Sequence, residues 1–204
     1  MDLFNKQTIP LPLGEGRFSD IVFWPNWLGQ SDADELLETA INKTPWRKDV
    51  INIMGKQIPI PRLQNWFGDP NTSYTYSRIR LQAVVFPGWM EQLRVNVERE
   101  TEKPFNRALV NYYRDGKDSV DWHADDEASL GFEPLIASVS VGAERVFQLR
   151  HNVTKEKIKI NLPHGSLLLM GAGIQEHWQH SVAKVKQLDD PRVNFTFRNM
   201  ASNG

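Results

Sequence analysis

Short runs of alternating hydrophobic and polar residues fill the second half of the chain, and this pattern predicts β-strands. Turn signals such as Asp115-Gly116 and Pro163-His164-Gly165 separate the runs. The predicted strands are Ala108 to Arg114, Leu135 to Val141, Arg145 to Arg150, Lys157 to Leu162, Ser166 to Met170, Trp178 to Val182 and Arg192 to Asn199. So many short strands in succession favour a β-sandwich, a jelly roll or a barrel.

The first half contains two segments with helical periodicity, Ser31 to Lys43 and roughly Trp89 to Glu102. Ser31 is a candidate N-cap for the first of them, and a hydrophobic stripe follows it: Leu36, Leu37, Ala40 and Ile41. Between the helices, Val50 to Pro61 predicts a β-hairpin with a Gly55-Lys56 turn, and its prolines indicate an exposed edge. We therefore expect a mixed α and β protein with a jelly-roll core and the helices packed outside it.

Length and composition fit a single globular domain. The chain has 204 residues, of which 40% are hydrophobic and 24% are charged, close to the averages for soluble proteins. No repeat, low-complexity tract or linker rich in Gly, Pro and Ser marks a domain boundary. We therefore treat residues 1–204 as one domain.

Residue types and charge limit the chemistry. Cysteine is absent, which excludes disulfides, thiolate zinc sites and cysteine nucleophiles, so a metal must be held by His, Asp or Glu. The N-terminal residues lack a basic stretch followed by an apolar one, and no run approaches the ~18 apolar residues of a membrane span, so we expect a cytoplasmic protein. The net charge of −1 lacks the basic excess of many nucleic-acid binders, although a local cluster of Lys and Arg can still contact phosphates.

The segment from Asp121 to Glu127 carries the most informative chemistry. Residues two apart in an extended chain face the same side, so His123 and Asp125 can bind one metal ion together. Two histidines and one carboxylate on an octahedral iron leave three positions open, enough for a bidentate organic acid and dioxygen. The alternative for so short a motif is a solvated loop.

Four histidines are candidates for the third ligand: His151, His164, His177 and His180. His177 and His180 are three residues apart, so on a strand they face opposite sides and only one of them can join the site. His164 lies in a Pro-His-Gly turn and His151 begins a polar loop, which favours local hydrogen bonds or solvent exposure for both. Periodicity does not choose between His177 and His180.

Two predicted strands offer polar faces that can bind a small acid. In the last strand, polar and apolar side chains alternate, so the four polar ones share one face: Arg192, Asn194, Thr196 and Arg198. Its two arginines are about 20 Å apart at 3.3 Å per residue, and Arg suits bidentate recognition of carboxylates. On the strand before the metal motif, Asn111 and Tyr113 share one face. The alternatives are an ordinary outer surface for the last strand and an amphipathic core strand for the other.

Six motifs follow one another along the chain: Asn111-Tyr112-Tyr113-Arg114-Asp115-Gly116, His123-Ala124-Asp125-Asp126-Glu127, Ile136-Ala137-Ser138-Val139-Ser140, His164-Gly165-Ser166-Leu167, His177-Trp178-Gln179-His180-Ser181 and Pro191-Arg192 through Arg198. With them the chain resembles the AlkB family of iron and 2-oxoglutarate dependent dealkylating dioxygenases. The hairpin makes it most similar in appearance to the members that prefer duplex DNA.

The resemblance implies an α+β fold with a double-stranded β-helix (jelly-roll) core over about residues 106–200. Residues 1–105 would then supply N-terminal helices and a β-hairpin nucleotide-recognition lid. It also implies that Fe(II) is bound by His123, Asp125 and His180. The cosubstrate 2-oxoglutarate would be held by Asn111, Tyr113, Arg192, Thr196 and Arg198, with Arg192 on its distal carboxylate and Arg198 nearer the metal.

The implied function is DNA repair. Such an enzyme demethylates N-alkylated bases of the 1-methyladenine and 3-methylcytosine type and releases formaldehyde, while 2-oxoglutarate and O2 are converted to succinate and CO2. The partner would be alkylated DNA, duplex or single-stranded, because the target base must be flipped out or already unpaired. We expect no membrane partner and no obligate protein partner.

The resemblance places substrate contacts in the hairpin, the lid and the metal motif: Met54, Gly55, Lys56, Arg62, Tyr74, Thr75, Tyr76, Ser77, Asp126 and Glu127. Met54 would fill the gap left by an extruded base, where similar proteins carry an aromatic residue. Tyr74 and Tyr76 would stack on the base and Asp126 would accept a hydrogen bond from its exocyclic amine. The alternatives are a Met without a role on an exposed turn, and surface packing of the tyrosines.

Two other functions use the same residues differently. The cosubstrate site can serve oxidation of RNA or of a protein side chain, in which case the hairpin has no role in opening a duplex. A non-catalytic jelly-roll module can use the metal and the arginines to sense a dicarboxylate. Turnover of 2-oxoglutarate to succinate separates the second alternative from an enzyme.

Overall fold

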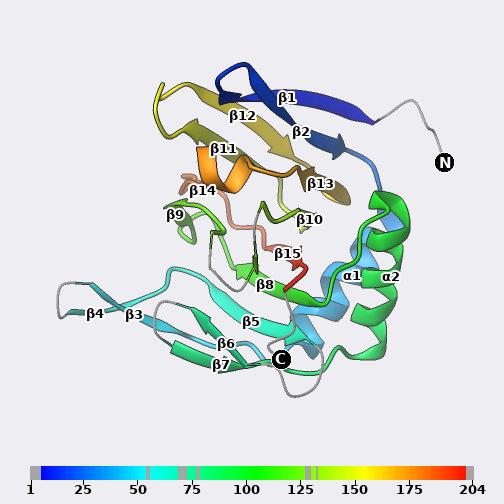
Figure 1. Cartoon of the computed structure of the whole chain (residues 1–204). Coiled ribbons are helices and arrows are strands. Elements are labelled where there is room, and N and C mark those ends of the chain that lie inside the picture. The colour runs from blue at the N-terminus through cyan, green and yellow to red at the C-terminus, as the bar shows by residue number, and fades with distance from the viewer. Residues whose placement is uncertain are drawn as a thin grey trace.

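Two antiparallel β-sheets face each other and form the body of the protein (Figure 1). The computed structural model describes residues 6–53, 56–68, 73–76, 79–126, 130–131 and 133–200, with the backbone alone for 51–53, 73–76 and 79–82. In spatial order, the larger sheet contains β1 (Gln7–Gly14), β2 (Arg17–Trp24), β13 (Ser166–Met170), β10 (Ile136–Gly142), β15 (Arg192–Arg198), β8 (Arg107–Tyr113) and β5 (Leu63–Gly68). The smaller sheet contains β12 (Lys157–Leu162), β11 (Arg145–His151), β14 (Trp178–Val182) and β9 (Val120–His123).

Two further hairpins lie outside these sheets, β3 (Val50–Ile53) with β4 (Lys56–Pro59) and β6 (Ser73–Tyr76) with β7 (Ile79–Gln82). The hairpin predicted between Val50 and Pro61 is therefore confirmed, and β4 is exposed along its length, as its prolines indicated. In Figure 1 both hairpins lie below the strands of the smaller sheet.

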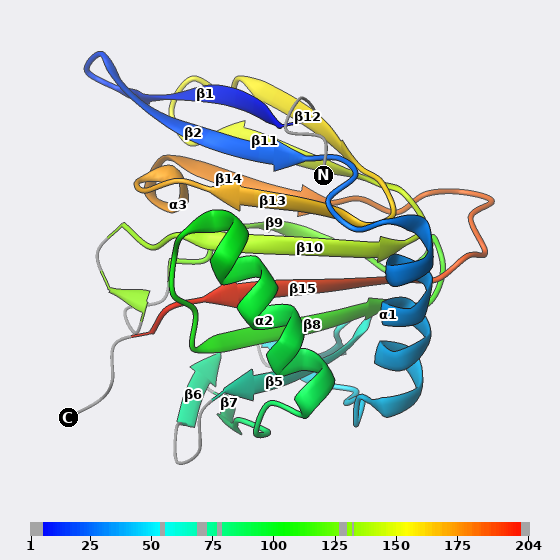
Figure 2. The same ribbon diagram turned by 90° about the vertical axis from the view of Figure 1, so that its right-hand side faces the viewer.

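Two long helices, α1 (Gln30–Lys43) and α2 (Gly88–Thr101), pack against the outer face of the larger sheet (Figure 2). Buried side chains of the helices meet the sheet residues Val139, Phe195 and Phe197; on the helix side these are Ala33, Ala40, Met90, Leu93 and Val97. A third helix, α3 (Ile174–His177), is a single short turn before β14. No helix in the described ranges is both long and apolar enough to cross a bilayer.

The start of α1 differs from the prediction. The helix begins at Gln30, and its N-cap is Gly29, whose carbonyl accepts the first helical hydrogen bond from Ala33 N at 3.0 Å. Ser31 therefore lies inside the first turn, where its hydroxyl cannot act as the N-cap acceptor. The helix gains acidic charge near its N-terminus from Asp32, which favours the dipole.

A hydrophobic core fills the space between the two sheets. Leu109 and Tyr113 of the larger sheet, Phe147 and Leu149 of the smaller one and Met170 belong to the same buried cluster. The predicted strands of the second half are all present within one residue or so at each end. The α+β class and the double-stranded β-helix core are thus confirmed.

The first 105 residues contribute more to the sheets than the sequence indicated. Strands β1, β2 and β5 come from this part and belong to the larger sheet, so the expected extension and the core share one sheet. Pro10 and Pro12 hid β1, because proline is depleted from strands. The structure tolerates them because β1 is an edge strand that pairs with β2 alone.

Candidate functional site

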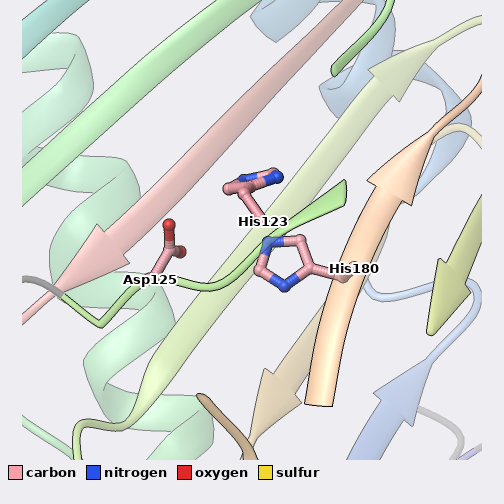
Figure 3. A group of neighbouring side chains, drawn as sticks. All are labelled: His123, Asp125 and His180. Atoms are coloured by element: carbon pink, nitrogen blue, oxygen red, sulfur yellow. The ribbon is translucent and has the colours of Figure 1, made fainter. Parts of the chain in front are cut away.

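Three side chains from the smaller sheet and the loop beyond it gather inside the molecule (Figure 3). His123 ends β9, Asp125 follows it by two residues, and His180 lies in the middle of β14. Each offers one ligand atom, and these atoms lie within 4.8 Å of one another. Within the described ranges this is the only group of three or more His, Asp or Glu residues close enough to hold a metal ion.

A bulge in β9 aims His123 into the interior. His180 pairs with His123 and Val182 pairs with Val120, so β9 has one residue more than β14 between the two pairs. The extra residue lets Val120 and His123 both line the interior cavity, although residues three apart on a regular strand face opposite sides. Asp125 lies beyond the end of the strand, so its proximity to His123 comes from the loop and not from strand alternation.

Hydrogen bonding and burial prepare both histidines as metal ligands. His123 Nδ1 lies 2.7 Å from the backbone carbonyl of Asp121, so a proton on Nδ1 leaves Nε2 as the free lone pair. Burial, and then the neighbouring His123, lower the pKa of His180 to about 3. A neutral imidazole is the form that binds a metal.

Asp125 is held ionised by Arg198. Its Oδ1 accepts a hydrogen bond from Arg198 Nη2 at 2.5 Å, and both side chains are buried. Burial by itself would raise the pKa of Asp125, but the charge of Arg198, with smaller contributions from His180 and His123, holds it below its usual value. The backbone N–H of Asp125 donates to Gln175 Oε1 at 3.0 Å, which fixes the loop. The sequence offered no signal for this role of Gln175.

A cavity beside the metal cluster contains every residue predicted to bind 2-oxoglutarate. Its lining includes the three candidate ligands and Asn111, Tyr113, Arg192, Thr196 and Arg198. Arg198 stands at the end occupied by Asp125, and the order of the two arginines along the cosubstrate stays a prediction. The two residues Asn194 and Ser138 also line it and hydrogen bond to each other at 2.8 Å.

Arg192 has the donors that a carboxylate would need. It is 2% exposed; its Nη2 donates to Ser140 Oγ at 2.9 Å, whereas its Nε and Nη1 are buried without a hydrogen-bond partner. Burial lowers its pKa to about 10, so it stays charged at neutral pH. A buried guanidinium with unused donors requires an acceptor, and a dicarboxylate in this cavity fits that requirement.

The polar face of β15 is an interior surface, and the alternative of an outer surface was wrong. All seven residues of β15 are buried. The strand is near the centre of the larger sheet, with the helices packed on Val193, Phe195 and Phe197 and the cavity on the other side. Alternation identified the two faces correctly, but it could not show that a second sheet covers the polar one.

The remaining described histidines, His177 among them, lie outside the metal cluster and contact other groups. His177 ends α3, and its ring lies 6.4 Å from that of His151 at an interplanar angle of 17°. His151 Nδ1 accepts hydrogen bonds from Val153 N and Thr154 N. His164 Nδ1 accepts one from Gly142 N at 2.7 Å. The predicted local hydrogen bonds of His151 are confirmed, whereas the partners of His164 are distant in sequence, Gly142 and, at 3.1 Å from Nε2, Asp34 Oδ1.

A cleft of about 520 Å³ lies between residues 60–62, which connect β4 to β5, and the strands β9 and β14. It is lined by His123, by Trp122 and by Arg62, among others. Arg62 is 6% exposed, and its Nε donates to Asn111 Oδ1 at 2.7 Å. Arg62 therefore lies in the wall between the cleft and the interior cavity, and its predicted contact with substrate stays a prediction.

The other predicted substrate residues are described only in part. Lys56 and Asp126 are exposed. Tyr74, Thr75 and Tyr76 belong to β6, of which the backbone alone is described. Met54, Gly55, Ser77 and Glu127 lie outside the described residues, and Glu127 immediately follows Asp126 in the chain. The roles of these residues stay predictions.

Arg145 is a buried residue that sequence reasoning missed. Its Nη2 donates to the carbonyls of Asp118 at 2.9 Å and Ala183 at 2.6 Å, which ties the turn before β9 to the end of β14. Its guanidinium carbon is 5.5 Å from the ring of Tyr113. Gly116 joins the same two segments, and a Cβ there would lie 2.1 Å from Val185 O. Both connections therefore position strands that carry candidate ligands.

Known proteins match the chain in sequence and in structure. The model of the 2OG-Fe(II) oxygenase superfamily matches residues 20–198. The mouse protein named alpha-ketoglutarate-dependent dioxygenase alkB homolog 3 is 40% identical over 199 residues, which is 92% of this chain and 67% of that protein. The human protein named DNA oxidative demethylase ALKBH2 is 36% identical over 181 residues, covering 83% of this chain and 69% of that protein.

The chain thus spans about two thirds of the length of these relatives. A solved structure of OsALKBH1 superposes with a TM-score of 0.62 at 20% identity, covers 88% of this chain and 97% of that one, and shows a common fold. The expectation of an enzyme that uses Fe(II), 2-oxoglutarate and O2 is confirmed, and the alternative of a non-catalytic module has no support. The chain belongs to the 2OG-Fe(II) oxygenase superfamily and, within it, to the AlkB family of iron and 2-oxoglutarate dependent dioxygenases.

Proposed function

We propose that this protein is a DNA repair dioxygenase that removes methyl groups from N-alkylated bases of the 1-methyladenine and 3-methylcytosine type. The observation that carries the proposal is the single cavity that joins the His123, Asp125 and His180 cluster to the buried Arg192, beside a cleft of about 520 Å³. The relatives named as DNA oxidative demethylases support DNA as the substrate. The products would be the unmodified base, formaldehyde, succinate and CO2.

Different residues of the site would hold the metal and the cosubstrate. Bound Fe(II), 2-oxoglutarate and dioxygen supply an oxidant strong enough to hydroxylate a methyl group. His123, Asp125 and His180 would hold the metal, and Arg198 keeps the Asp125 carboxylate ionised and oriented. Arg192 would bind the distal carboxylate through the donors that have no other partner.

The interior walls and the mouth of the site would serve the base. Leu109, Phe147, Met170 and Val182 give the cavity an apolar lining that excludes water from the reacting centre. Asp126 is exposed and lies three residues after His123 in the chain. Its carboxylate can accept a hydrogen bond from the exocyclic amine of the base. The hydroxymethyl group formed on the ring nitrogen is unstable and leaves as formaldehyde.

Turnover on a methylated oligonucleotide tests the proposal. The protein is incubated with Fe(II), 2-oxoglutarate and a DNA strand that contains one 1-methyladenine, and mass spectrometry follows the loss of the methyl group together with formaldehyde. His180→Ala should abolish the reaction, while His177→Ala, three residues away and outside the cluster, is the matched control. Failure of the wild-type protein on every methylated DNA would overturn the proposal.

The same assay tests the alternative substrates. Methylated RNA and peptides replace the DNA strand under identical conditions, and succinate formation reports uncoupled turnover. Faster demethylation of RNA than of DNA, or oxidation of a peptide alone, would favour the alternative function. Met54→Ala tests the hairpin: a selective loss on duplex over single-stranded DNA is expected if Met54 fills the gap left by the base.

A further inference from the structure

An aromatic side chain next to a candidate metal ligand lies on the opposite side of its strand. Trp122 precedes His123, but its indole ring lies beneath the guanidinium of Arg150, with 4.4 Å between the guanidinium carbon and the ring centroid. Arg150 is flanked on β11 by the buried Leu149 and His151, so its own side chain faces outward. Its Nη2 donates to Gln179 Oε1 at 2.8 Å, which fixes the guanidinium over the ring.

Further basic side chains lie on the same outer face of the smaller sheet as this ring. The register places Lys157 opposite Arg150 and Lys159 opposite Gln148, and both lysines are exposed. Lys184, just beyond β14, is exposed and lines the cleft. The outward positions of β11, β12 and β14 include no acidic residue; they are Val146, Gln148, Arg150, Lys157, Lys159, Asn161, Gln179 and Ser181. On β9 itself, the exposed Asp121 precedes Trp122, also lines the cleft and accepts a hydrogen bond from the backbone N–H of Trp122 at 2.8 Å.

The outer face is continuous with the mouth of the site. His123, Trp122, Gln148 and Lys184 line the same cleft, so the cleft extends from a candidate metal ligand to the outer side of the sheet. β9 is the edge strand of the smaller sheet and pairs with β14 alone. A nucleic-acid strand whose target base enters at His123 can therefore continue over this edge toward Trp122.

We propose that the outer face of the smaller sheet binds the nucleotide that flanks the target base in single-stranded DNA, with the flanking base stacked on Trp122 and the backbone phosphates near Arg150 and Lys184. An aromatic ring combined with a basic groove is the usual means of binding unpaired nucleic acid, because every base has a face that can stack. A base in an intact duplex is already stacked and paired, so it cannot turn to the indole. The inference rests on the proposed function and deepens it by assigning a preference for unpaired strands.

A coupling experiment tests the stacking contact. The protein, loaded with Fe(II) and 2-oxoglutarate without oxygen, is titrated by fluorescence anisotropy into a labelled single strand with one 1-methyladenine. In two further strands the base on the 5′ or the 3′ side is replaced by an abasic sugar that keeps its phosphate. One abasic replacement should weaken wild-type binding about 5- to 100-fold, and Trp122→Ala should weaken binding of the intact strand to a similar extent.

The losses of affinity caused by the abasic replacement and by Trp122→Ala should not add. In Trp122→Ala the abasic replacement should have little further effect, and Trp122→Phe should restore much of the affinity. Phe18, which is 65% exposed on β2 in the larger sheet, gives the matched control for loss of an exposed aromatic, and Phe18→Ala should bind as the wild type does. The abasic strands and Trp122→Phe keep the test decisive if Trp122→Ala does not fold.

Full additivity at both flanking positions would overturn the proposal, and so would equal coupling on a fully paired duplex. A failure of the proposed function looks different, because the wild-type protein would then give no demethylated base when oxygen is admitted to the same mixture. Demethylation without coupling leaves the repair function standing and removes the stacking site alone.

Discussion

The interior cavity and the outer cleft meet at His123, yet they are built in opposite ways. The cavity is formed by buried side chains from central strands, and its charged groups already contact protein atoms, as Asp125 does with Arg198. The cleft is formed by an edge strand, by the connection between β4 and β5 and by exposed groups such as Lys184. The difference indicates that the candidate metal ligands depend on the core of the fold, whereas the exposed lining of the cleft can change without disturbing that core.

The largest effect should come from the interior. Asp125→Ala removes a carboxylate ligand and leaves the buried Arg198 without its anion, so we expect loss of metal binding and of all turnover. Calorimetric titration with Mn(II) in place of iron measures the affinity without catalysis. Asp126→Ala is the control on the next residue, which is exposed and should bind the metal normally. Normal metal binding by Asp125→Ala would exclude Asp125 as a ligand.

The second effect concerns the cosubstrate end of the cavity. Arg192→Met keeps the volume and removes the unpaired donors, so 2-oxoglutarate should bind more weakly by about 2–5 kcal/mol, or at least ~30-fold. Equilibrium binding to the protein loaded with Mn(II) checks this, with the metal affinity as an internal control. The affinity of Arg192→Lys for 2-oxoglutarate should fall between those of the wild type and Arg192→Met, because a lysine keeps the charge but lacks the planar pair of donors. Unchanged affinity in Arg192→Met would place the distal carboxylate elsewhere.

The third effect concerns the turn that precedes β9, between the two regions. Asp118 is 4% exposed and accepts three hydrogen bonds from Arg114, from its backbone N, Nε and Nη2. Burial would raise the pKa of Asp118, but the hydrogen bonds from the side chain and backbone of Arg114 hold it below the usual value. The ionised carboxylate therefore stabilises the native state above about pH 4, and this contribution is lost as the pH falls through the depressed pKa.

Asp118→Asn should accordingly lower the free energy of unfolding by about 1–3 kcal/mol at pH 7. The difference from the wild type should shrink below about pH 4, as measured by urea unfolding at both pH values. Asp189→Asn, an exposed acid in the loop before β15, is the control and should behave as the wild type at both. A difference that stays constant with pH would mean that the charge of Asp118 contributes nothing.

The smallest effect should come from the cleft. Lys184 is exposed and contacts substrate only through charge in our proposal, so Lys184→Ala should weaken binding of single-stranded DNA a few-fold. It should also reduce the slope of log affinity against log salt concentration by about 0.7. Lys103→Ala, beyond the end of α2, is the control for a lost surface charge. An unchanged slope would remove Lys184 from the path of the strand.

The sequence predicted the interior better than the cleft, for physical reasons. Alternation in Arg192 to Arg198 separated the two faces of β15, because strand periodicity is independent of what covers each face. The choice between His177 and His180 depended on where α3 ends and β14 begins, which periodicity did not reveal. Arg62 and Arg145 are buried arginines whose partners are distant in sequence, so nothing local distinguished them from surface charges.

The bulged edge strand β9 has a consequence for how the protein takes up its metal. β9 has two registered pairs with β14 and no neighbour on its other side, so its amides should be among the least protected from hydrogen exchange in the sheet. An ion shared by His123, Asp125 and His180 would join this strand to its neighbour and to the loop held by Arg198. Metal loading should then slow hydrogen exchange in residues 120–125 more than elsewhere. Iron would thus stabilise this edge of the fold as well as serve as the reactive centre.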